Sequence, residues 1–244
     1  PEGVTSIGNY AFQRCSSLTS ITIPEGVTSI GDDAFNTCDS LTSITIPDSV
    51  TSIGESAFYQ CGRLTSITIP SRVTSIGERA FDSCYSLVSV TIPSRVTSIG
   101  ERAFYGCSSL TLIEVDSLNT AYSSEDGVLF NKDKTILIQY PAGNTRTSYT
   151  IPSSVTSIVN YAFSSCSSLT SITIPDSVTS IGESAFWDCS RLATIRINAT
   201  TPPTLGSFAI PDNVTNIYVP AGSVDAYKSA SGWSNYASII SAIQ

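Results

Sequence analysis

A unit of 23 residues repeats along most of the chain, and this period restricts the possible folds more than any other feature of the sequence. Prolines recur at one phase of the unit, at Pro1, Pro24, Pro47, Pro70 and Pro93, and again at Pro152 and Pro175. The dipeptide Ala-Phe recurs at 11–12, 34–35, 57–58, 80–81, 103–104, 162–163 and 185–186. Such a period indicates a solenoid, in which each repeat buries its apolar face against its neighbours.

The first part of each unit predicts a short strand. In residues 18–23, Ile21 and Ile23 alternate with Ser20 and Thr22, which is the period-2 pattern of a strand with one buried side. A proline then ends the strand, because it has no N–H for a hydrogen-bonded ladder. Nine such strands are expected, near 18–23, 41–46, 64–69, 87–92, 110–115, 147–151, 169–174, 192–197 and 216–219. They would pair in parallel about 4.8 Å apart.

The second part of the unit returns the chain to the next strand. Val27 and Ile30 predict another short extended piece, and Gly31 turns the chain. Residues 32–36 are too few for a stable helix, so we expect one helical or 3-10 turn that buries Ala34 and Phe35.

The unit L-x-x-I-x-I-P-x-x-V-x-x-I-G-x-x-A-F-x-x-C-x-x resembles the BspA-like leucine-rich repeats of bacterial surface and secreted proteins. The resemblance covers most of the chain. It implies a leucine-rich-repeat solenoid with a curved parallel sheet on the concave side and short extended pieces and turns on the convex side. Members of this family are associated with adhesion to host or matrix proteins. The resemblance therefore implies a cell-surface or secreted binding protein.

One position departs from the general leucine-rich pattern, which has Asn or Cys nine residues into the unit. This chain has Gly26, Ser49, Arg72, Arg95, Ser154 and Ser177 at that position. The asparagine ladder of the general pattern is therefore expected to be absent.

We expect a single solenoid over 1–244, with regular repeats at 1–115 and 149–197. The irregular insertion 116–148 contains two apolar runs, 128–130 and 136–140, around a polar turn, which predicts a β-hairpin. The insertion is interpreted either as a structural cassette that replaces one repeat's convex side or as a protruding ligand contact through Lys132, Asp133 and Lys134.

Residues 198–244 predict a C-terminal cap, since terminal repeats must cover their open core. Ser223 would N-cap a short helix over 224–229, and Gly232 would end it. The aromatic and apolar residues expected to cover the core are Trp233, Tyr236, Ile239 and Ile240. At the other end, Pro1 enters in mid-unit and the chain has no Met, so we expect further repeats or a cap, and any signal peptide, upstream.

Charge and composition disfavour several function classes. The net charge is −8 with only three lysines, so nucleic acid and anionic membranes are not expected partners. No run of about 18 apolar residues exists that could span a membrane. The chain has no His, which removes Ser-His-Asp and Cys-His catalysis, and it has no nucleotide-binding or calcium-binding motif. We therefore expect neither an enzyme nor a cofactor.

The seven cysteines all occupy the same phase of the unit, at Cys15, Cys38, Cys61, Cys84, Cys107, Cys166 and Cys189. Zinc sites need close pairs of ligands, and none exists here. Parallel Cβ vectors disfavour disulfides between neighbouring repeats. The sequence therefore predicts a ladder of buried, reduced cysteines and no metal site.

Exposed strand residues predict the binding surface, because concave sheets are the usual binding surface of such solenoids. They form rows of hydroxyl groups that change character at two places. The candidates are Ser43, Thr45, Ser66, Thr68, Ser89, Thr91, Glu114, Ser171, Thr173 and Arg196. The alternative is a merely soluble face, since Thr suits strands. On the turns, Tyr59, Tyr85, Tyr105 and Trp187 are expected to be exposed.

Two functions remain open. The first is an adhesin-type module that binds an extracellular or host protein or a glycan, as a monomer. The second is a structural spacer that displays another domain of a larger surface protein, which near-identical repeats would also suit. Ice binding by threonine rows is disfavoured because leucine-rich sheets curve, and sugar hydrolysis by paired carboxylates is disfavoured because the acids recur with the repeat.

Overall fold

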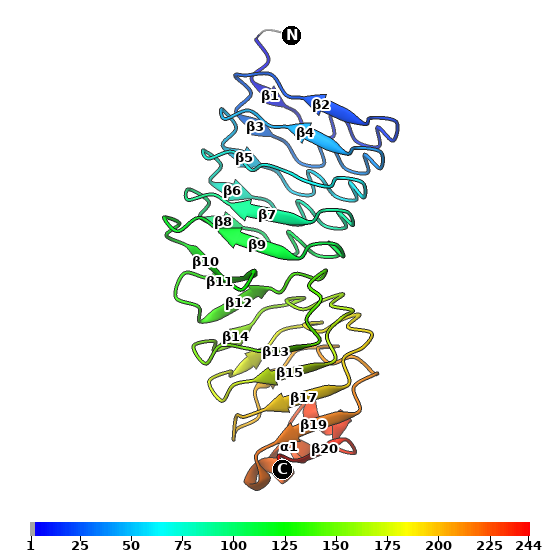
Figure 1. Cartoon of the computed structure of the whole chain (residues 1–244), viewed down its shortest axis with the longest axis vertical. Helices are drawn as coiled ribbons and strands as arrows, with labels where there is room; N and C mark the ends of the chain where they lie inside the picture. Colours follow the sequence, from blue (N-terminus) through cyan, green and yellow to red (C-terminus); the bar gives the residue numbers. More distant parts are fainter. Residues whose placement is uncertain (1–2) are drawn as a thin grey trace. The chain divides into compact units, whose positions relative to one another are not determined.

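The computed structural model describes residues 3–244, and the contacts among its residues divide the chain into two compact units. Unit 1 comprises residues 1–132 with 141–143, and unit 2 comprises 133–140 with 144–244. Each unit is a stack of coils to which successive repeats contribute short parallel strands (Figure 1). The solenoid predicted from the repeat is therefore confirmed within each unit.

Unit 1 contains two sets of parallel strands on different sides of its coils. One ladder joins β1 (Ser6–Ile7), β3 (Ser29–Ile30), β5 (Ser52–Ile53), β6 (Ser75–Ile76) and β8 (Ser98–Ile99). The other set corresponds to the predicted strands: β2 (Ser20–Thr22) pairs with β4 (Ser43–Thr45), and β7 (Ser89–Ile92) pairs with β9 (Leu112–Val115). Partners such as Ser20 and Ser43 are one repeat apart, so the register of the sheet is the period of the sequence.

The expected strand near 64–69 is extended but is not a regular strand. Its side chains keep the alternation, with Ile67 and Ile69 buried and Ser66 and Thr68 exposed. The backbone hydrogen bonds beside it are long, at 3.5 Å from the Thr65 N–H to the Thr42 carbonyl and 3.3 Å from the Val88 N–H to the Thr65 carbonyl. The side chains of this segment are therefore buried and exposed as the sequence predicts, whereas its backbone hydrogen bonds to the neighbouring coils are long.

Unit 2 repeats this arrangement. One ladder orders β12 (Ile136–Gln139), β14 (Ser157–Ile158), β16 (Ser180–Ile181) and β18 (Thr204–Leu205). The other orders β13 (Ser148–Thr150), β15 (Ser171–Ile174), β17 (Thr194–Ile197), β19 (Asn216–Val219) and β20 (Ile240–Ala242). The last strand was not predicted, and it extends the ladder beyond the recognisable repeats.

The segments expected to form helical or 3-10 turns instead form successive hydrogen-bonded turns. In the repeat around Phe35, Asp33 and Thr37 have positive φ angles of 54° and 59°, which point alternate N–H groups out of the coil. The Phe35 N–H donates to the Ala57 carbonyl at 2.8 Å, and the Thr37 N–H donates to the Tyr59 carbonyl at 2.7 Å. The turns therefore bond to the next coil rather than within a helix.

Stacked phenylalanines fill the core beside these turns. In unit 1, the rings of Phe12, Phe35, Phe58, Phe81 and Phe104 lie 5.1–5.6 Å apart, with interplanar angles of 1–3°. The ring of Phe163 stacks on Phe186 in unit 2 at 5.0 Å. Identical side chains at a fixed period thus produce a continuous apolar column, as repeat stacking requires.

The cysteines form the buried, reduced ladder that the sequence predicts, except that Cys15 is exposed. The Cys84 thiol donates to the Phe58 carbonyl of the preceding coil at 3.2 Å, and Cys61 and Cys107 make equivalent bonds. Burial raises the pKa of Cys38 to about 11 and that of Cys107 to about 12. Because the thiolate is the reactive form, these thiols are packing groups that also satisfy a carbonyl.

The insertion 116–148 contains an antiparallel hairpin of β10 (Tyr122–Glu125) and β11 (Val128–Asn131), which turns at Asp126–Gly127. The Ile113 N–H donates to the Gly127 carbonyl at 3.0 Å, and the Val115 N–H donates to Ser124 Oγ at 3.0 Å. The hairpin thus satisfies backbone groups on the edge of β9. The hairpin predicted between 128–130 and 136–140 would join segments of different units, and it stays a prediction.

Asn119 fixes the loop that leads into this hairpin. Its buried side-chain amide donates to the carbonyls of Pro93 and Val96 at 2.7 and 3.0 Å. Its Oδ1 accepts from the N–H groups of Ala121 and Tyr122, both at 2.8 Å. All four bonding positions of the amide are used, so this asparagine takes over backbone pairing where the repeat is interrupted.

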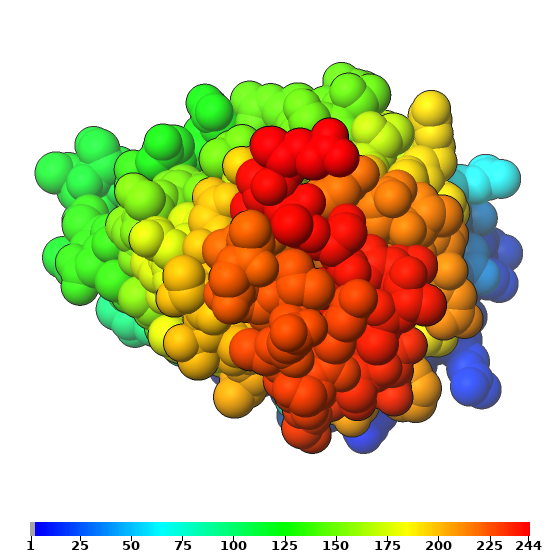
Figure 2. Space-filling view, turned by 90° about the horizontal axis from the view of Figure 1, so that it is seen from below, coloured from blue at the N-terminus to red at the C-terminus, as the bar shows by residue number. Residues whose placement is uncertain are grey.

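Residues 198–244, which the sequence predicts to be a C-terminal cap, lie at the end of unit 2, where Figure 2 shows them in orange and red. This segment contains η1 (Ala221–Ser223), α1 (Val224–Ser229) and η2 (Trp233–Tyr236). Trp233 and Ile240 are buried, whereas Tyr236 and Ile239 are half-buried. Ser223 is the N-cap residue of α1, but its side chain makes no capping hydrogen bond, which differs from the expectation.

Candidate functional site

The threonine and serine hydroxyl groups of the repeat fall into two sets with different roles. Threonines that precede a strand bond to the coil before them: Thr51 Oγ1 donates to the Thr28 carbonyl at 3.0 Å, and Thr74 Oγ1 donates to the Thr51 carbonyl at 3.2 Å. Thr42 Oγ1 does the same with the Thr19 carbonyl at 3.1 Å. These hydroxyl groups use their proton within the scaffold, so they offer a ligand an acceptor but no donor.

The second set lies on the exposed side of the predicted strands, which we call the ladder face. On this face of unit 1, Ser43, Thr45, Ser66, Thr68, Ser89 and Thr91 are all exposed. Within residues 3–244, none of these hydroxyl groups makes an intramolecular hydrogen bond. Each therefore keeps a donor and an acceptor for solvent or for a partner.

The two rows of unit 1 end at β9, where their chemistry changes. Leu112 lies opposite Ser89, and the exposed Glu114 lies opposite Thr91. The predicted residues of unit 1 thus share one face, made of hydroxyl groups with a carboxylate and an apolar side chain at its end.

The ladder face of unit 2 carries the remaining predicted strand residues. Ser171 and Thr173 on β15 are half-buried, and Thr173 lies opposite Arg196 on β17. Arg196 in turn lies opposite Tyr218 on β19. Its guanidinium Nε donates to Asn198 Oδ1 at 3.4 Å. This face is therefore more varied than that of unit 1, with an arginine and a tyrosine in the row of threonines.

The three insertion candidates are consecutive in the chain, and their role in binding stays a prediction. Lys132 belongs to unit 1, whereas Asp133 and Lys134 belong to unit 2. The Lys132 ammonium group donates to the Asn119 carbonyl, so it is engaged by its own loop. The Lys134 carbonyl accepts a hydrogen bond from the Ser154 hydroxyl at 2.9 Å.

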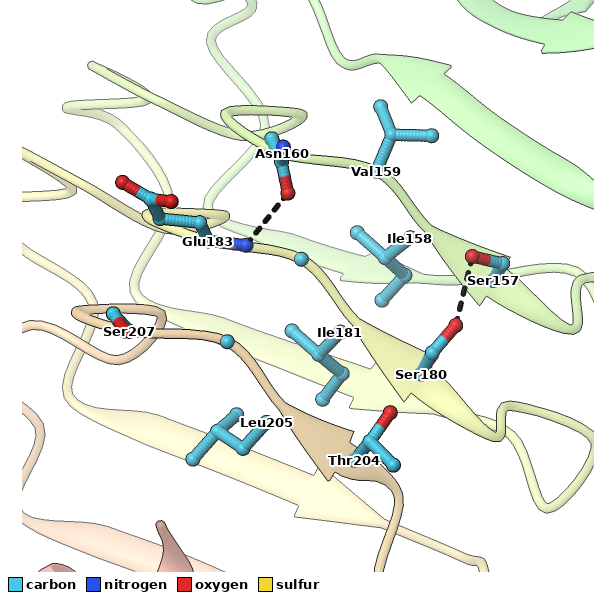
Figure 3. A pocket seen from close by; sticks show the side chains of 12 residues that line it. Ser157, Ile158, Val159, Asn160, Ser180, Ile181, Glu183, Thr204, Leu205 and Ser207 are labelled. Carbon is cyan, nitrogen blue, oxygen red and sulfur yellow. Dashed lines mark hydrogen bonds between the residues drawn. The ribbon is translucent and has the colours of Figure 1, made fainter.

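A shallow groove on the other sheet of unit 2 was not predicted. It has a volume of about 650 Å³ and follows β14, β16 and β18 (Figure 3). Ser157, Ser180 and Thr204 line one side, and the Ser180 hydroxyl donates to Ser157 Oγ at 2.8 Å. On the other side, the Glu183 N–H donates to Asn160 Oδ1 at 2.8 Å. Ser157-Ile158, Ser180-Ile181 and Thr204-Leu205 occupy one phase of the repeat, but strand alternation did not show that they line a groove.

No catalytic or metal-binding constellation stands out in the part of the chain that the structure describes. Among residues 3–244, no three His, Cys, Asp or Glu side chains are grouped so that they could hold a metal ion. In the same residues, no helix has both the length and the apolar character needed to cross a membrane.

A stability measurement distinguishes the two sets of hydroxyl groups. We expect Thr74→Val to lower the free energy of unfolding by about 1 kcal/mol, because it removes the hydrogen bond from Thr74 Oγ1 to the Thr51 carbonyl. The matched change Thr68→Val removes an exposed hydroxyl without an intramolecular partner, and it should alter stability by less than about 0.5 kcal/mol. Urea denaturation monitored by circular dichroism gives both values. Equal losses in the two variants would contradict the division.

Short strands that recur in register, a core of stacked identical side chains and a polar strand face define the chain as a leucine-rich-repeat solenoid. The sequence also matches the family model of the BspA type leucine rich repeat region over residues 1–126 and 142–231, in 6 copies. Because this match covers more than half of the chain, the protein belongs to the BspA-type leucine-rich-repeat family.

Solved structures of bacterial repeat proteins are similar to this chain. A leucine-rich repeat protein from Eubacterium ventriosum is 30% identical, with a TM-score of 0.61, over 90% of this chain and 73% of that chain. A leucine rich cell surface protein from Faecalibacterium prausnitzii is 28% identical, with a TM-score of 0.56, over 99% and 83%. The pneumococcal vaccine antigen PcpA, 20% identical with a TM-score of 0.59 over 98% and 83%, shows likeness of fold alone. The search of curated proteins gave no match.

Proposed function

We propose that this chain is a protein-binding module of a bacterial cell-surface or secreted protein, that it serves in adhesion, and that it acts without a catalytic step. The proposed binding surface is the ladder face of unit 1, with its hydroxyl rows and Glu114. The proposed partner is an extracellular or host protein that the monomer binds.

The observation that carries this proposal is the separation of the hydroxyl groups into two sets. Folding accounts for Thr51 and Thr74, whose hydroxyl groups bond to the preceding coil. No such bond accounts for Ser66 or Thr68, which are exposed and have no intramolecular hydrogen bond within the described residues. Regularly spaced donors and acceptors on a fixed backbone suit polar recognition, because a rigid surface loses little entropy on binding.

The family and the similar structures support a surface location. The similar protein from Faecalibacterium prausnitzii is described as a cell surface protein, and repeat solenoids generally bind other proteins through extended surfaces. The low content of charged residues, 13%, also favours a partner recognised by hydrogen bonds rather than by dense charge.

The test is a binding screen of the 1–244 chain against immobilised extracellular matrix proteins and, in a separate arm, glycans. The double variant Ser66→Arg/Thr68→Arg places two long cations at the middle of the ladder face. We expect it to weaken binding of any partner found by about tenfold or more, because bulk and charge would prevent close contact. Surface plasmon resonance gives the dissociation constants.

A matched control is Ser71→Arg, which adds an arginine at an exposed position just beyond the strand segment. It should bind like the unchanged chain. Full binding by the double variant would exclude the ladder face of unit 1 as the site. Failure of the unchanged chain to bind any protein would contradict the proposed function and favour the spacer.

A further inference from the structure

The last coils of unit 2 and the residues of the cap line a second cavity, separate from the groove along β14, β16 and β18. Its volume is about 590 Å³, within the range of small-ligand pockets. Trp187 and Asp188 line it from one coil, Phe208 and Asp212 from the next coil, and Tyr236 from η2. It lies within unit 2 and shares none of the ladder-face residues.

Two aromatic side chains at this cavity are exposed. Trp187 is 49% exposed and Phe208 is 71% exposed. The repeat holds this position in a left-handed conformation with different residue types: φ is 55° at Phe208, 50° at Ser184 of the preceding coil and 62° at Tyr10. The coil therefore accepts a ring or a small side chain here, and its backbone does not require an aromatic one.

Two carboxylates lie beside these rings without a cationic partner. Asp188 and Asp212 occupy equivalent positions in consecutive coils, and both are exposed. Among residues 3–244, no basic side chain forms an ion pair with either of them. Within the described residues, the one hydrogen bond to the Asp188 carboxylate is long, at 3.5 Å from the Ser165 hydroxyl. No lysine or arginine lines the cavity.

Tyr236 forms a fixed wall of the cavity. Its hydroxyl donates to the Ile210 carbonyl at 3.0 Å, so its ring is held in place. Burial, and then the negative charge of Asp212, raise the pKa of Tyr236. Aromatic and carboxylate side chains therefore line one space.

We propose that this cavity binds an organic cation, namely a guanidinium or quaternary ammonium group, which contacts the rings of Trp187 and Phe208 and pairs with Asp188 and Asp212. Aromatic rings attract such cations through the negative charge on their faces, and a guanidinium also stacks on them. The two carboxylates supply the opposite charge. This site is separate from the ladder face, so it stands independently of the proposed function.

Titration of the full chain with cations and their neutral isosteres tests the proposal. One pair is N-acetyl-arginine amide and N-acetyl-citrulline amide, which represents a protein side chain. The other is choline and 3,3-dimethylbutan-1-ol, which represents a small free cation. Trp187 reports binding by fluorescence, because the only other tryptophan, Trp233, is buried in the cap. We expect at least one cation to bind about tenfold more tightly than its isostere, and the better pair identifies the source of the cation.

The double variant Asp188→Asn/Asp212→Asn keeps the shape of the cavity and removes its charge. It should weaken cation binding by about tenfold or more at low salt while the melting temperature stays unchanged. Asp176→Asn, an exposed carboxylate elsewhere in unit 2, is the control and should bind normally. Three results would overturn the proposal: no cation binds, the neutral isosteres bind equally well, or the double variant retains full affinity.

Discussion

Replacement of Gly77 by alanine is expected to lower the free energy of unfolding by at least about 3 kcal/mol, because it forces two coils apart. A Cβ at Gly77 would lie 2.4 Å from the Gly54 carbonyl carbon and 2.5 Å from both the Gly54 oxygen and the Glu55 nitrogen. These neighbours are backbone atoms of the preceding coil, so no side-chain rotation can relieve the contact. Urea denaturation of the variant, monitored by circular dichroism, measures the loss.

Gly8→Ala is the matched control for this prediction. Gly8 occupies the same position of the repeat, but an added Cβ there has no atom within 4 Å. Alanine should therefore leave stability unchanged or raise it by about 0.5 kcal/mol, because it restricts the unfolded chain. If both substitutions destabilised equally, the cause would be the conformation of glycine rather than the close approach of the coils.

One coil shows that glycine is needed at this position because of the coil before it, and not because of the repeat pattern itself. Val159 occupies the equivalent position and is half-buried, and the coil before it is the irregular one that contains β12. In the following coil, a Cβ on Gly182 would lie 2.5 Å from the carbonyl carbon of Val159. Glycine is thus required where a regular coil precedes, which no single repeat reveals.

The sequence predicted the strands well because their signal is local and repeated. Alternation such as that of Ile44 and Ile46 with Ser43 and Thr45 determines which side is buried, and the period of 23 determines the register. The turns were predicted less well. Left-handed residues such as Thr37 and Gln60 are neither glycine nor asparagine, so their sequence gave no sign of the conformation that directs N–H groups to the next coil.

The candidate residues could be named from the sequence. The sequence could not separate the hydroxyl groups that bond to a neighbouring coil from those that stay exposed. Thr51 directly precedes β5 and Thr45 lies in β4, and their side chains are chemically identical. Of the two, only the Thr51 hydroxyl donates a hydrogen bond to the preceding coil. The difference depends on side-chain direction relative to a neighbouring backbone, which spacing does not encode. Similarly, β10 reads Y-S-S-E and has no apolar alternation, because it pairs with β11 and supplies side-chain oxygens such as Tyr122 Oη, which accepts the Ile99 N–H at 2.9 Å.

The cavity beside Trp187 illustrates the same limit. The position of Trp187 in the repeat predicts that it is exposed, but an exposed aromatic alone has no functional implication. Its significance arises from Phe208, Asp212 and Tyr236, which are 21, 25 and 49 residues further along the chain and outside the regular repeats. Only the closure of the last coils by the cap brings them together.

Phe81→Ala is expected to lower the free energy of unfolding by about 3–5 kcal/mol, because it opens a gap in the middle of the aromatic column. Phe81 is fully buried, and its ring centroid lies 5.4 Å from that of Phe58 and 5.6 Å from that of Phe104. Since each coil of a solenoid is stabilised only by its neighbours, a central gap weakens two interfaces at once.

Phe12 is half-buried and stacks on Phe35 alone in unit 1, so Phe12→Ala should cost about half as much. Phe81→Ile should recover most of the loss, since Ile210 fills the equivalent position in the coil after the last regular repeat and is buried. Urea denaturation of the three variants measures these values. Equal losses at Phe12 and Phe81 would show that the column acts through the volume of single side chains rather than through its continuity.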